Sequence, residues 1–351
     1  MMVVSAGSRC RLRRSLVLPL AISAVLLFVA VRGVDWTQVL ATLRRGRVDF
    51  LALVCLILTI SYVIRALRWR VVLSAERRIA PMTVFWATMV GYLGNSVLPA
   101  RAGELIRSAL LARKVDLSMS YVLATALLER LADVVALTII GLLGLLVLGT
   151  VPDWLLTVAP VAGVVGLLGL AVPRFLPCFD RQLINYAARL PVPPRLRIRL
   201  TTLLSQFLLG LGALRNRRRG LTFAALTAVI WILDVVVALM IAQAFALPLL
   251  VPQAMVLLAA LGFASAVPST PGYVGVYQFV AVTVLLPFGF SRDQAIVQVI
   301  GLQGVVYAVE IVCGTLGLWY LSGLKGALPW RPLASTATAS IEYHARDIAS
   351  T

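Results

Sequence analysis

The sequence is poor in the residues that most enzymes use for acid–base catalysis and metal binding. It has one histidine, His344 in the polar C-terminal tail, and four isolated cysteines, Cys10, Cys55, Cys178 and Cys313. Without a CxxC pair or a Cys/His cluster, neither a disulfide framework nor a zinc site is indicated. The HxxxxD, HExxH, GxSxG, Walker A and DxD motifs are also missing. We therefore expect a protein that is not an enzyme and uses no cofactor or metal.

Charged residues are scarce as well. They make up 13% of the chain against 61% hydrophobic residues, and the mean hydropathy is +0.97. A soluble domain is about half apolar and about a quarter charged. The composition, together with apolar runs of helical-span length, predicts an all-α polytopic membrane protein.

The formal net charge of +18 does not indicate nucleic-acid binding. Ten of the 32 basic residues lie in the segment 174–219, and most others flank apolar runs. The positive-inside bias of membrane proteins produces this distribution, which also suits the anionic inner leaflet. No aromatic–basic recognition module is present, so we expect no nucleic-acid partner.

Apolar runs divide the chain into candidate spans of about 20 residues. Long runs occupy residues 16–31, 50–64, 134–151, 154–172, 221–247 and 295–322. Shorter pieces occupy 84–98, 104–115, 253–267 and 273–288. These lengths predict about six full spans plus two re-entrant hairpins, at 84–115 and 253–288. The alternative is a plain bundle of eight spans.

Basic clusters predict the orientation and the division of the chain. The clusters at 1–14, 65–78, 101–114, 174–219 and the C-terminal tail are expected on the cytoplasmic side. The first run, 16–31, is expected to stay as an uncleaved helix. The segment 32–49 conflicts with this orientation, because it carries four arginines yet falls outside. We expect a transmembrane domain over 15–328, with half-repeats at about 50–149 and 221–322, and a disordered tail over 329–351. Residues 174–219 indicate either a cytoplasmic helix pair or a basic connecting loop.

Two apolar segments, one in each half of the chain, are broken by proline and glycine. The first spans 91–107 and contains Pro99 and Gly103, and the second spans 262–278 and contains Pro268 and Gly272. Paired breaks of this kind point to a transport site near the middle of the membrane. The order of elements in the two halves predicts an inverted repeat. Kinks without any ligand are the simpler explanation.

Several ionisable residues lie inside or beside the apolar spans, where each costs about 2.5–3.5 kcal/mol on insertion scales and usually serves a function. They are Glu104, Arg107, Glu129, Arg130, Asp133, Asp234 and Glu310. Arginine and a half-helix N-terminus both favour an anionic headgroup. We predict that Arg101, Arg107 and Arg130 bind the headgroup.

We further predict that Glu104, Glu129, Asp133 and Asp234 couple protons or ions. Simpler explanations stay open for these residues. Glu129, Arg130 and Asp133 would also serve as an ion-paired seam between helices. Asp234 would serve as the packing partner of an internal arginine, and Glu310 would be hydrogen-bonded by Tyr307 and Gln303.

Four segments together resemble the flippase-like transmembrane domain of the lysylphosphatidylglycerol synthase family. They are RALRWRVVL (65–73), GYLGNSVLPARAGELIRSALL (91–111), ALLERLADVVAL (126–137) and SAVPSTPGYVGVYQ (265–278). The resemblance extends over about residues 15–325. It implies re-entrant helices and a role in moving lipids or lipid-linked intermediates between leaflets. The soluble synthase domain of the lysyl-transferring members is not expected, because the chain ends soon after its last apolar run.

The resemblance also implies a set of site residues, of which Glu129 and Asp133 are expected to couple ions and the others to bind the substrate. From the first motif and the following helix motif they are Asn95, Pro99, Arg101, Gly103, Glu104, Arg107, Glu129, Arg130 and Asp133. From the second broken segment they are Pro268, Pro271, Gly272, Gly275 and Gln278. Tyr273 replaces a glycine of the family pattern, and Gln278 stands where glutamate is usual. These departures weaken an ion-coupling role for residue 278 and are expected to narrow the cavity.

We predict a translocator of an anionic lipid or lipid-linked glycan. One alternative is a membrane partner that organises a separately encoded glycosyl- or aminoacyl-transferase without transporting anything. Another is an intramembrane enzyme that acts on a lipid phosphate. The sequence leaves open the lipid, the direction, the energy source and the oligomeric state.

Overall fold

The fold is helical throughout the part of the chain that the structure describes. The computed structural model describes residues 20–98, 102–149, 175–266 and 269–323, with isolated positions 163, 164, 168 and 171. These residues form helices and turns without a strand, so the predicted all-α class is confirmed. The predicted N-terminal segment 1–14, most of the run 154–172 and the predicted tail 329–351 lie outside the described residues.

Five helical segments among the described residues are long and apolar enough to cross a membrane. Four are single helices: α3 (Val48–Leu73), α6 (Met119–Leu148), α10 (Arg217–Ala244) and α13 (Arg292–Gly323). The fifth, Pro271–Phe288, combines η4 (Pro271–Tyr273), α12 (Val276–Leu285) and η5 (Leu286–Phe288). A sixth is reached if the helix Leu20–Val31 and α2 (Trp36–Arg44), bent by 88°, count as one span. The total is close to the six predicted spans, but Pro271–Phe288 was predicted as part of a hairpin, and most of the predicted run 154–172 lies outside the described residues.

The remaining helices are shorter. They are α4 (Pro81–Val97), α5 (Ala102–Val115), α8 (Asp180–Arg189), α9 (Pro194–Leu211) and α11 (Val251–Ala264), with the turns η2 (Leu176–Phe179) and η3 (Gly212–Arg215). The α4–α5 pair and the α11–α12 pair coincide with the segments predicted to form re-entrant hairpins. Their course relative to a membrane stays a prediction.

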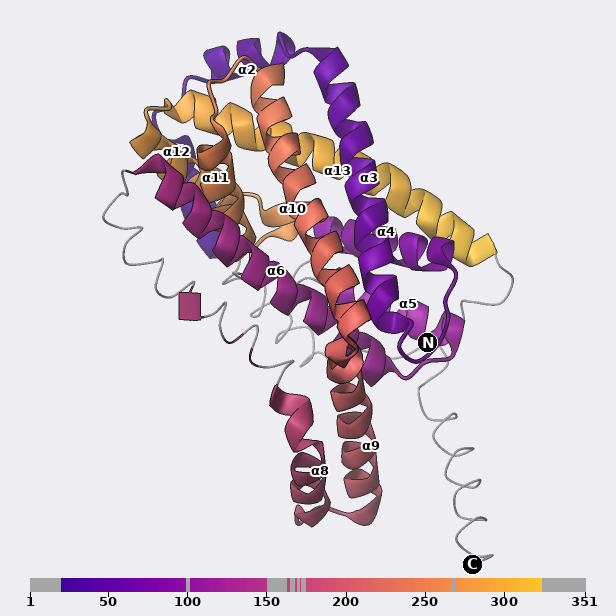
Figure 1. Ribbon diagram of the computed structural model, residues 1–351. Helices are drawn as coiled ribbons and strands as arrows, with labels where there is room; N and C mark the ends of the chain where they lie inside the picture. The colour runs from indigo at the N-terminus through magenta and orange to yellow at the C-terminus, as the bar shows by residue number, and fades with distance from the viewer. Residues whose placement is uncertain are drawn as a thin grey trace, which may run out of the picture.

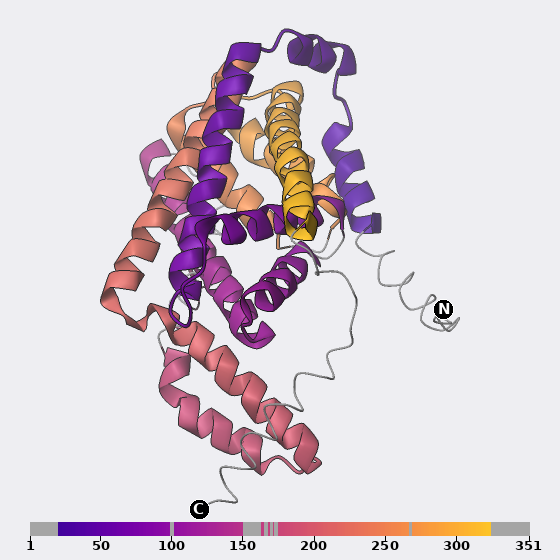
Figure 2. The same ribbon diagram turned by 90° about the vertical axis from the view of Figure 1, so that its right-hand side faces the viewer.

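Helices α3 and α10 run antiparallel side by side along one face of the bundle (Figures 1 and 2). The amide of Arg47 donates to the carbonyl of Ala244 at 3.0 Å at one end, and Arg68 reaches Thr227 at 3.3 Å further along. The predicted run 50–64 was too short, because α3 continues as helix to Leu73. Its arginines do not end the helix, since carboxylates on neighbouring helices neutralise two of them.

The hairpin of each half packs on the long helix of the other half. Helix α4 packs along α13, and α11 packs along α6. Glycines make both approaches close, since small residues let helix backbones come together in membrane proteins. Gly314 and Gly317 of α13 face the backbone and side chains of α4, and Gly141 and Gly144 of α6 face α11. The two halves are therefore interlocked.

The α4–α5 hairpin depends on one glycine at the start of α5. A Cβ atom on Gly103 would lie 1.9 Å from the carbonyl oxygen of Gly91 and 2.6 Å from the amide nitrogen of Asn95. Both neighbours are backbone atoms of α4 and cannot turn aside. Gly103, expected in the substrate site, thus has a packing role in setting the distance between α4 and α5.

Helices α8 and α9 form the helix pair expected within 174–219. The pair extends from one end of the bundle in both ribbon views (Figures 1 and 2). It is joined to the bundle through α9, where Gly210 packs against Ala124 and the carbonyl of Tyr121 on α6. Its function, and its cytoplasmic location, stay predictions.

We predict that Gly103→Ala destabilises the protein, because the added methyl group overlaps fixed backbone atoms. Overpacking of this kind costs about 1–3 kcal/mol or more. Gly304→Ala is the matched control, since a Cβ there meets nothing within 4 Å in α13. Thermal unfolding in detergent, followed by tryptophan fluorescence, should show a lower midpoint for Gly103→Ala alone. Equal midpoints for the two variants would contradict the packing role.

Candidate functional site

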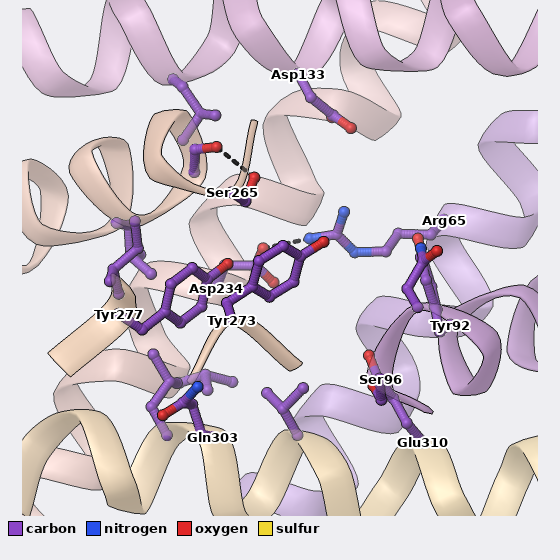
Figure 3. A pocket seen from close by; sticks show the side chains of 18 of the residues that line it. Arg65, Tyr92, Ser96, Asp133, Asp234, Ser265, Tyr273, Tyr277, Gln303 and Glu310 are labelled. Atoms are coloured by element: carbon purple, nitrogen blue, oxygen red, sulfur yellow. Dashed lines mark hydrogen bonds and ion pairs between the residues drawn. The ribbon is translucent and has the colours of Figure 1, made fainter. Parts of the chain in front are cut away.

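A cavity of about 330 Å³ lies at the centre of the bundle. Both halves of the chain build its wall: α3, α4 and α6 come from the first half, and α10, α11, α12 and α13 come from the second (Figure 3). The charged residues in the wall are Arg65, Arg130, Asp133, Asp234 and Glu310. Because a buried charge is costly unless it is paired and hydrogen-bonded, the partners of these residues decide what the cavity can bind.

Arg65 and Asp234 form an ion pair that joins α3 to α10 at the cavity wall (Figure 3). The Ser61 hydroxyl donates to the second carboxylate oxygen of Asp234 at 3.1 Å. The Arg65 guanidinium carbon lies 5.7 Å from the centre of a Trp231 ring. The side chains of Arg65 and Asp234 are 14% and 15% exposed, so the pair is accessible from the cavity. Pairing with an internal arginine is the simpler role foreseen for Asp234, and its coupling role stays a prediction.

Arg68 lies behind the wall and binds two carboxylates of α6. It contacts Asp133 in a bidentate manner at 2.6 and 3.2 Å, and Glu129 at 3.4 Å. Glu129 in turn binds Arg107 of α5 at 3.0 Å. Arg107 stacks over Trp69, with its guanidinium carbon 4.4 Å from the ring centre. This chain of ion pairs fastens α3, α5 and α6 together.

Arg130 binds Glu104, which connects α6 to the first turn of α5. The two side chains are 33% and 21% exposed, more than those of the Arg68 network. Arg130 lines the cavity, and Glu104 is linked to the cavity wall through its pair with Arg130. Among the residues that the structure describes, Arg65 and Arg130 are the two cationic groups on the cavity wall, and each is held by a carboxylate.

The hydrogen-bond partners of Glu310 lie on α3 and α4, and not on its own helix α13 as expected. The Tyr62 hydroxyl donates to one carboxylate oxygen at 3.0 Å, and Ser96 of α4 contacts the other. The expected partners, Tyr307 and Gln303, instead bind the carbonyl of Gly272. Sequence spacing within α13 suggested the local partners, but the bond to Ser96 depends on the packing of α4 against α13.

The second broken segment is held by neutral groups. Gly272 and Gly275 adopt φ values of +69° and +90°, which side chains rarely tolerate, and so glycine is needed at both. The Gln278 side chain accepts from the Gly275 amide at 2.7 Å and donates to Gln303 at 2.7 Å. Gln278 therefore shapes the elbow at the start of α12, and Gln303 is the member of the pair that lines the cavity.

Aromatic side chains cover much of the remaining wall. Tyr273 and Tyr277 stack with ring centres 4.9 Å apart, and Tyr62 and Tyr92 pack with ring centres 5.2 Å apart (Figure 3). Tyr273 adopts φ +60°, an unusual value for a residue with a side chain. This residue, where the family pattern has glycine, places its ring in the cavity wall.

The structure brings part of the predicted site together at the cavity. Asn95, Arg130, Asp133 and Asp234 line it. Among the other predicted residues, Glu104, Glu129 and Arg107 form ion pairs beside or behind the wall, Gly103 and Gly275 serve packing, and Pro271 begins η4. Pro99, Arg101 and Pro268 lie outside the described residues.

Sequence reasoning missed Arg65 and Arg68, which were assigned to a cytoplasmic cluster. A signal for them was present, because Ser61, Arg65 and Arg68 follow one another at helical spacing of four and three residues. Three polar residues on one face of a span indicate a polar interior, whereas the hydropathy of the run alone placed its end at residue 64.

Comparison with known proteins supports the resemblance found in the motifs. Residues 16–314 match the family model described as the lysylphosphatidylglycerol synthase TM region. Glycosyltransferase AglD of Haloferax volcanii is 24% identical over 308 residues, which are 78% of this chain and 49% of that protein. The chain thus spans about half the length of this curated relative. No solved structure matches this chain.

We predict that Arg68→Ala lowers the free energy of unfolding by about 3–5 kcal/mol, because it leaves Asp133 and one side of Glu129 buried without a counter-charge. Arg47→Ala is the control, since Arg47 pairs with Asp49 at the surface and should cost below about 1 kcal/mol. The measurement is thermal unfolding of both variants in detergent.

An apolar replacement separates pairing from packing. Arg68→Met combined with Asp133→Leu should recover part of the lost stability, because Glu129 keeps its bond to Arg107. A midpoint for Arg68→Ala as high as that of Arg47→Ala would show that the network contributes no stability.

Proposed function

Because the chain belongs to the lysylphosphatidylglycerol synthase transmembrane-region family, we propose that it translocates an anionic lipid or lipid-linked intermediate across the cell membrane. The observation that carries the proposal is the central cavity, in which Arg65 and Arg130 are each held by one partly exposed carboxylate. We place both termini on the cytoplasmic side, as the basic clusters predict.

The phosphate of the headgroup takes the place of a carboxylate on the cavity arginines. A guanidinium binds phosphate and carboxylate in the same bidentate geometry, so one oxyanion replaces the other without rebuilding the site. Asp234 and Glu104 are the carboxylates available for exchange, because their arginines face the cavity. Arg68, Arg107 and Glu129 are buried more deeply and hold the helices in position.

The exchange couples the lipid to protons. A carboxylate that loses its arginine in apolar surroundings becomes an isolated buried charge, which is costly enough to favour protonation. Binding of the phosphate to Arg65 would thus be accompanied by proton uptake at Asp234. This gives Asp234 and Glu104 the coupling role predicted for them. Asp133 and Glu129, which pair with buried arginines, would instead hold the helices in position.

Movement of the headgroup requires the cavity to open to each side in turn. Support for two related halves comes from a repeated pattern among the cavity-lining residues. Four residues of α6 that line the cavity are each followed, after the same number of residues, by a residue of α13 that also lines it. The pairs are Arg130 and Gln303, Asp133 and Val306, Val134 and Tyr307, and Leu137 and Glu310. The same spacing separates the packing glycines Gly141 and Gly144 of α6 from Gly314 and Gly317 of α13.

The pattern extends to the hairpins. A second constant spacing relates Tyr92, Asn95 and Ser96 of α4 to Leu258, Leu261 and Gly262 of α11, all of which line the cavity. We infer that the halves form the predicted inverted repeat and that one half rocks against the other around the cavity.

The cavity wall favours a headgroup that carries hydroxyl groups as well as phosphate. The stacked Tyr273–Tyr277 rings offer apolar faces, and the side-chain oxygens of Gln303 and Ser96, each of which already takes part in a hydrogen bond within the protein, have a lone pair left to accept from a hydroxyl. A sugar phosphate has this combination of faces and hydroxyls. The name of the AglD relative, a glycosyltransferase, is consistent with a lipid-linked glycan.

A non-transporting membrane partner of a transferase is the second candidate function. The observation that favours it is the α8–α9 pair, which extends from the bundle (Figures 1 and 2). Exposed apolar residues on that pair, including Tyr186, Leu196 and Ile198, would suit contact with another protein. This function does not require a lipid headgroup to pass through the central cavity.

We predict that Arg65→Gln lowers the translocation rate at least about tenfold, because one charge-assisted phosphate contact is lost. Purified protein is reconstituted in liposomes with labelled phosphatidylglycerol or a labelled polyprenyl-phosphate sugar. A membrane-impermeant quencher then reports exchange between leaflets. Arg65→Lys keeps the positive charge but loses the bidentate geometry of the guanidinium, so its translocation rate should fall between those of Arg65→Gln and wild type.

Arg47→Gln is the control for the loss of an arginine, since Arg47 lies at the surface away from the cavity. Folded Arg65→Gln protein that translocates at the wild-type rate would contradict the cavity as the path. No exchange with wild type, together with activation of an added transferase, would support the partner function. New lipid products detected by mass spectrometry in the same liposomes would indicate an enzyme.

A further inference from the structure

A second cavity, of about 590 Å³, lies where α3 ends and α10 begins. It is lined by the last turn of α3, the loop that follows and the first turns of α10. Four arginines converge on it, Arg70, Arg78, Arg218 and Arg219, together with the hydroxyl residues Ser74 and Thr222. No residue of the central site lines it.

The charge in this second cavity is not balanced by the protein. Within the part of the chain that the structure describes, none of its four arginines forms an ion pair. Glu76, the acidic residue of the same loop, is exposed and binds none of them. The arginines of the central cavity, in contrast, are each neutralised by a carboxylate. An anion from outside would balance the second cavity.

The arginine side chains, and not the helix end, supply the binding groups. Asn216 caps α10 by accepting from the amides of Arg218 at 3.0 Å and Arg219 at 3.3 Å. Nε of Arg70 donates to the carbonyl of Ile79 at 2.6 Å, which fixes its guanidinium at the cavity. A fixed guanidinium with further arginines around it is suited to bidentate phosphate binding.

A buried layer separates the second cavity from the central one. Along the antiparallel α3–α10 pair, Arg68, Phe223 and Thr227 lie between the residues that line the two cavities. Arg68 and Phe223 are buried and contact each other, with the guanidinium carbon 5.4 Å from the ring centre. The two cavities are therefore distinct binding places.

We propose that this second cavity binds the phosphate of an anionic lipid headgroup at the basic end of the bundle. Four unbalanced arginines at the end of two spanning helices lie where the phosphates of the adjoining leaflet are found. A free phosphate ion shares the same chemistry. The inference does not depend on translocation, since the site would also anchor lipid around a protein that transports nothing.

The test uses the full chain in detergent with phosphatidylglycerol that carries a photoreactive headgroup, and a phosphatidylcholine probe as the neutral control. Cross-linked peptides are identified by mass spectrometry. Arg78→Gln/Arg219→Gln removes two lining arginines. Arg215→Gln/Arg217→Gln removes two exposed arginines of the same region that do not line the cavity. Thr222→Trp fills the cavity and keeps every charge.

We expect cross-links from phosphatidylglycerol within residues 70–78 and 217–222. Their yield should fall about tenfold or more in Arg78→Gln/Arg219→Gln and in Thr222→Trp, but not in Arg215→Gln/Arg217→Gln. Cross-links to α11 serve as an internal standard for folded protein. Excess inorganic phosphate that suppresses the cross-links would assign the site to phosphate itself, and no suppression would assign it to the lipid. An equal fall in both double variants, or no cross-link at the cavity, would overturn the proposal.

Discussion

The structure depends on pairing arginine with carboxylate in a setting that tolerates neither alone. At about 3 Å and an effective dielectric constant of about 20, such a pair gains about 5 kcal/mol of Coulomb energy, which is similar to the desolvation of its charges. The net stability is therefore small, while the loss of one partner is expensive. Arg65, Arg68, Arg107 and Arg130 with their carboxylates tie α3, α5, α6 and α10 together in this way.

The same pairing gives the central cavity its proposed chemistry. With each wall arginine neutralised, the empty cavity carries no strong unbalanced charge at Arg65 or Arg130 and can persist between apolar helices. In the proposed function, an incoming phosphate would meet a preformed guanidinium and replace its present carboxylate partner. We expect the pairs of Arg68 and Arg107 to persist during this exchange, because both arginines are almost fully buried behind the cavity wall, even though Asp133, one partner of Arg68, lines the cavity. These pairs keep the helices in place. The interlocked hairpins would let the two halves move as units around this centre.

Hydropathy and helix-breaking residues predicted the class of fold, the limits of α10 and α13 to within a few residues, and the position of both hairpins. They failed at α3, because its arginines look like the end of a span when their partners are unknown. Asp234 lies 169 residues after Arg65, and no local pattern connects the two. Local spacing also suggested Tyr307 and Gln303 for Glu310, whereas packing brought Tyr62 and Ser96 to it. The sequence thus indicated where helices begin, end and break, whereas the partners of the buried charges depend on packing between helices that local spacing does not show.

The central claim is that a lipid phosphate replaces Asp234 on Arg65 and that the carboxylate then takes up a proton. It is tested most directly by calorimetric titration of the detergent-solubilised protein with short-chain phosphatidylglycerol, in buffers of different ionisation enthalpy. This phosphodiester does not titrate near neutral pH, and no carboxylate is among the described residues that line the second cavity. Proton uptake must therefore come from the central site. We predict net uptake by the wild type and a clear reduction in Asp234→Asn. Binding without proton uptake, or with the same uptake in both proteins, would contradict the account.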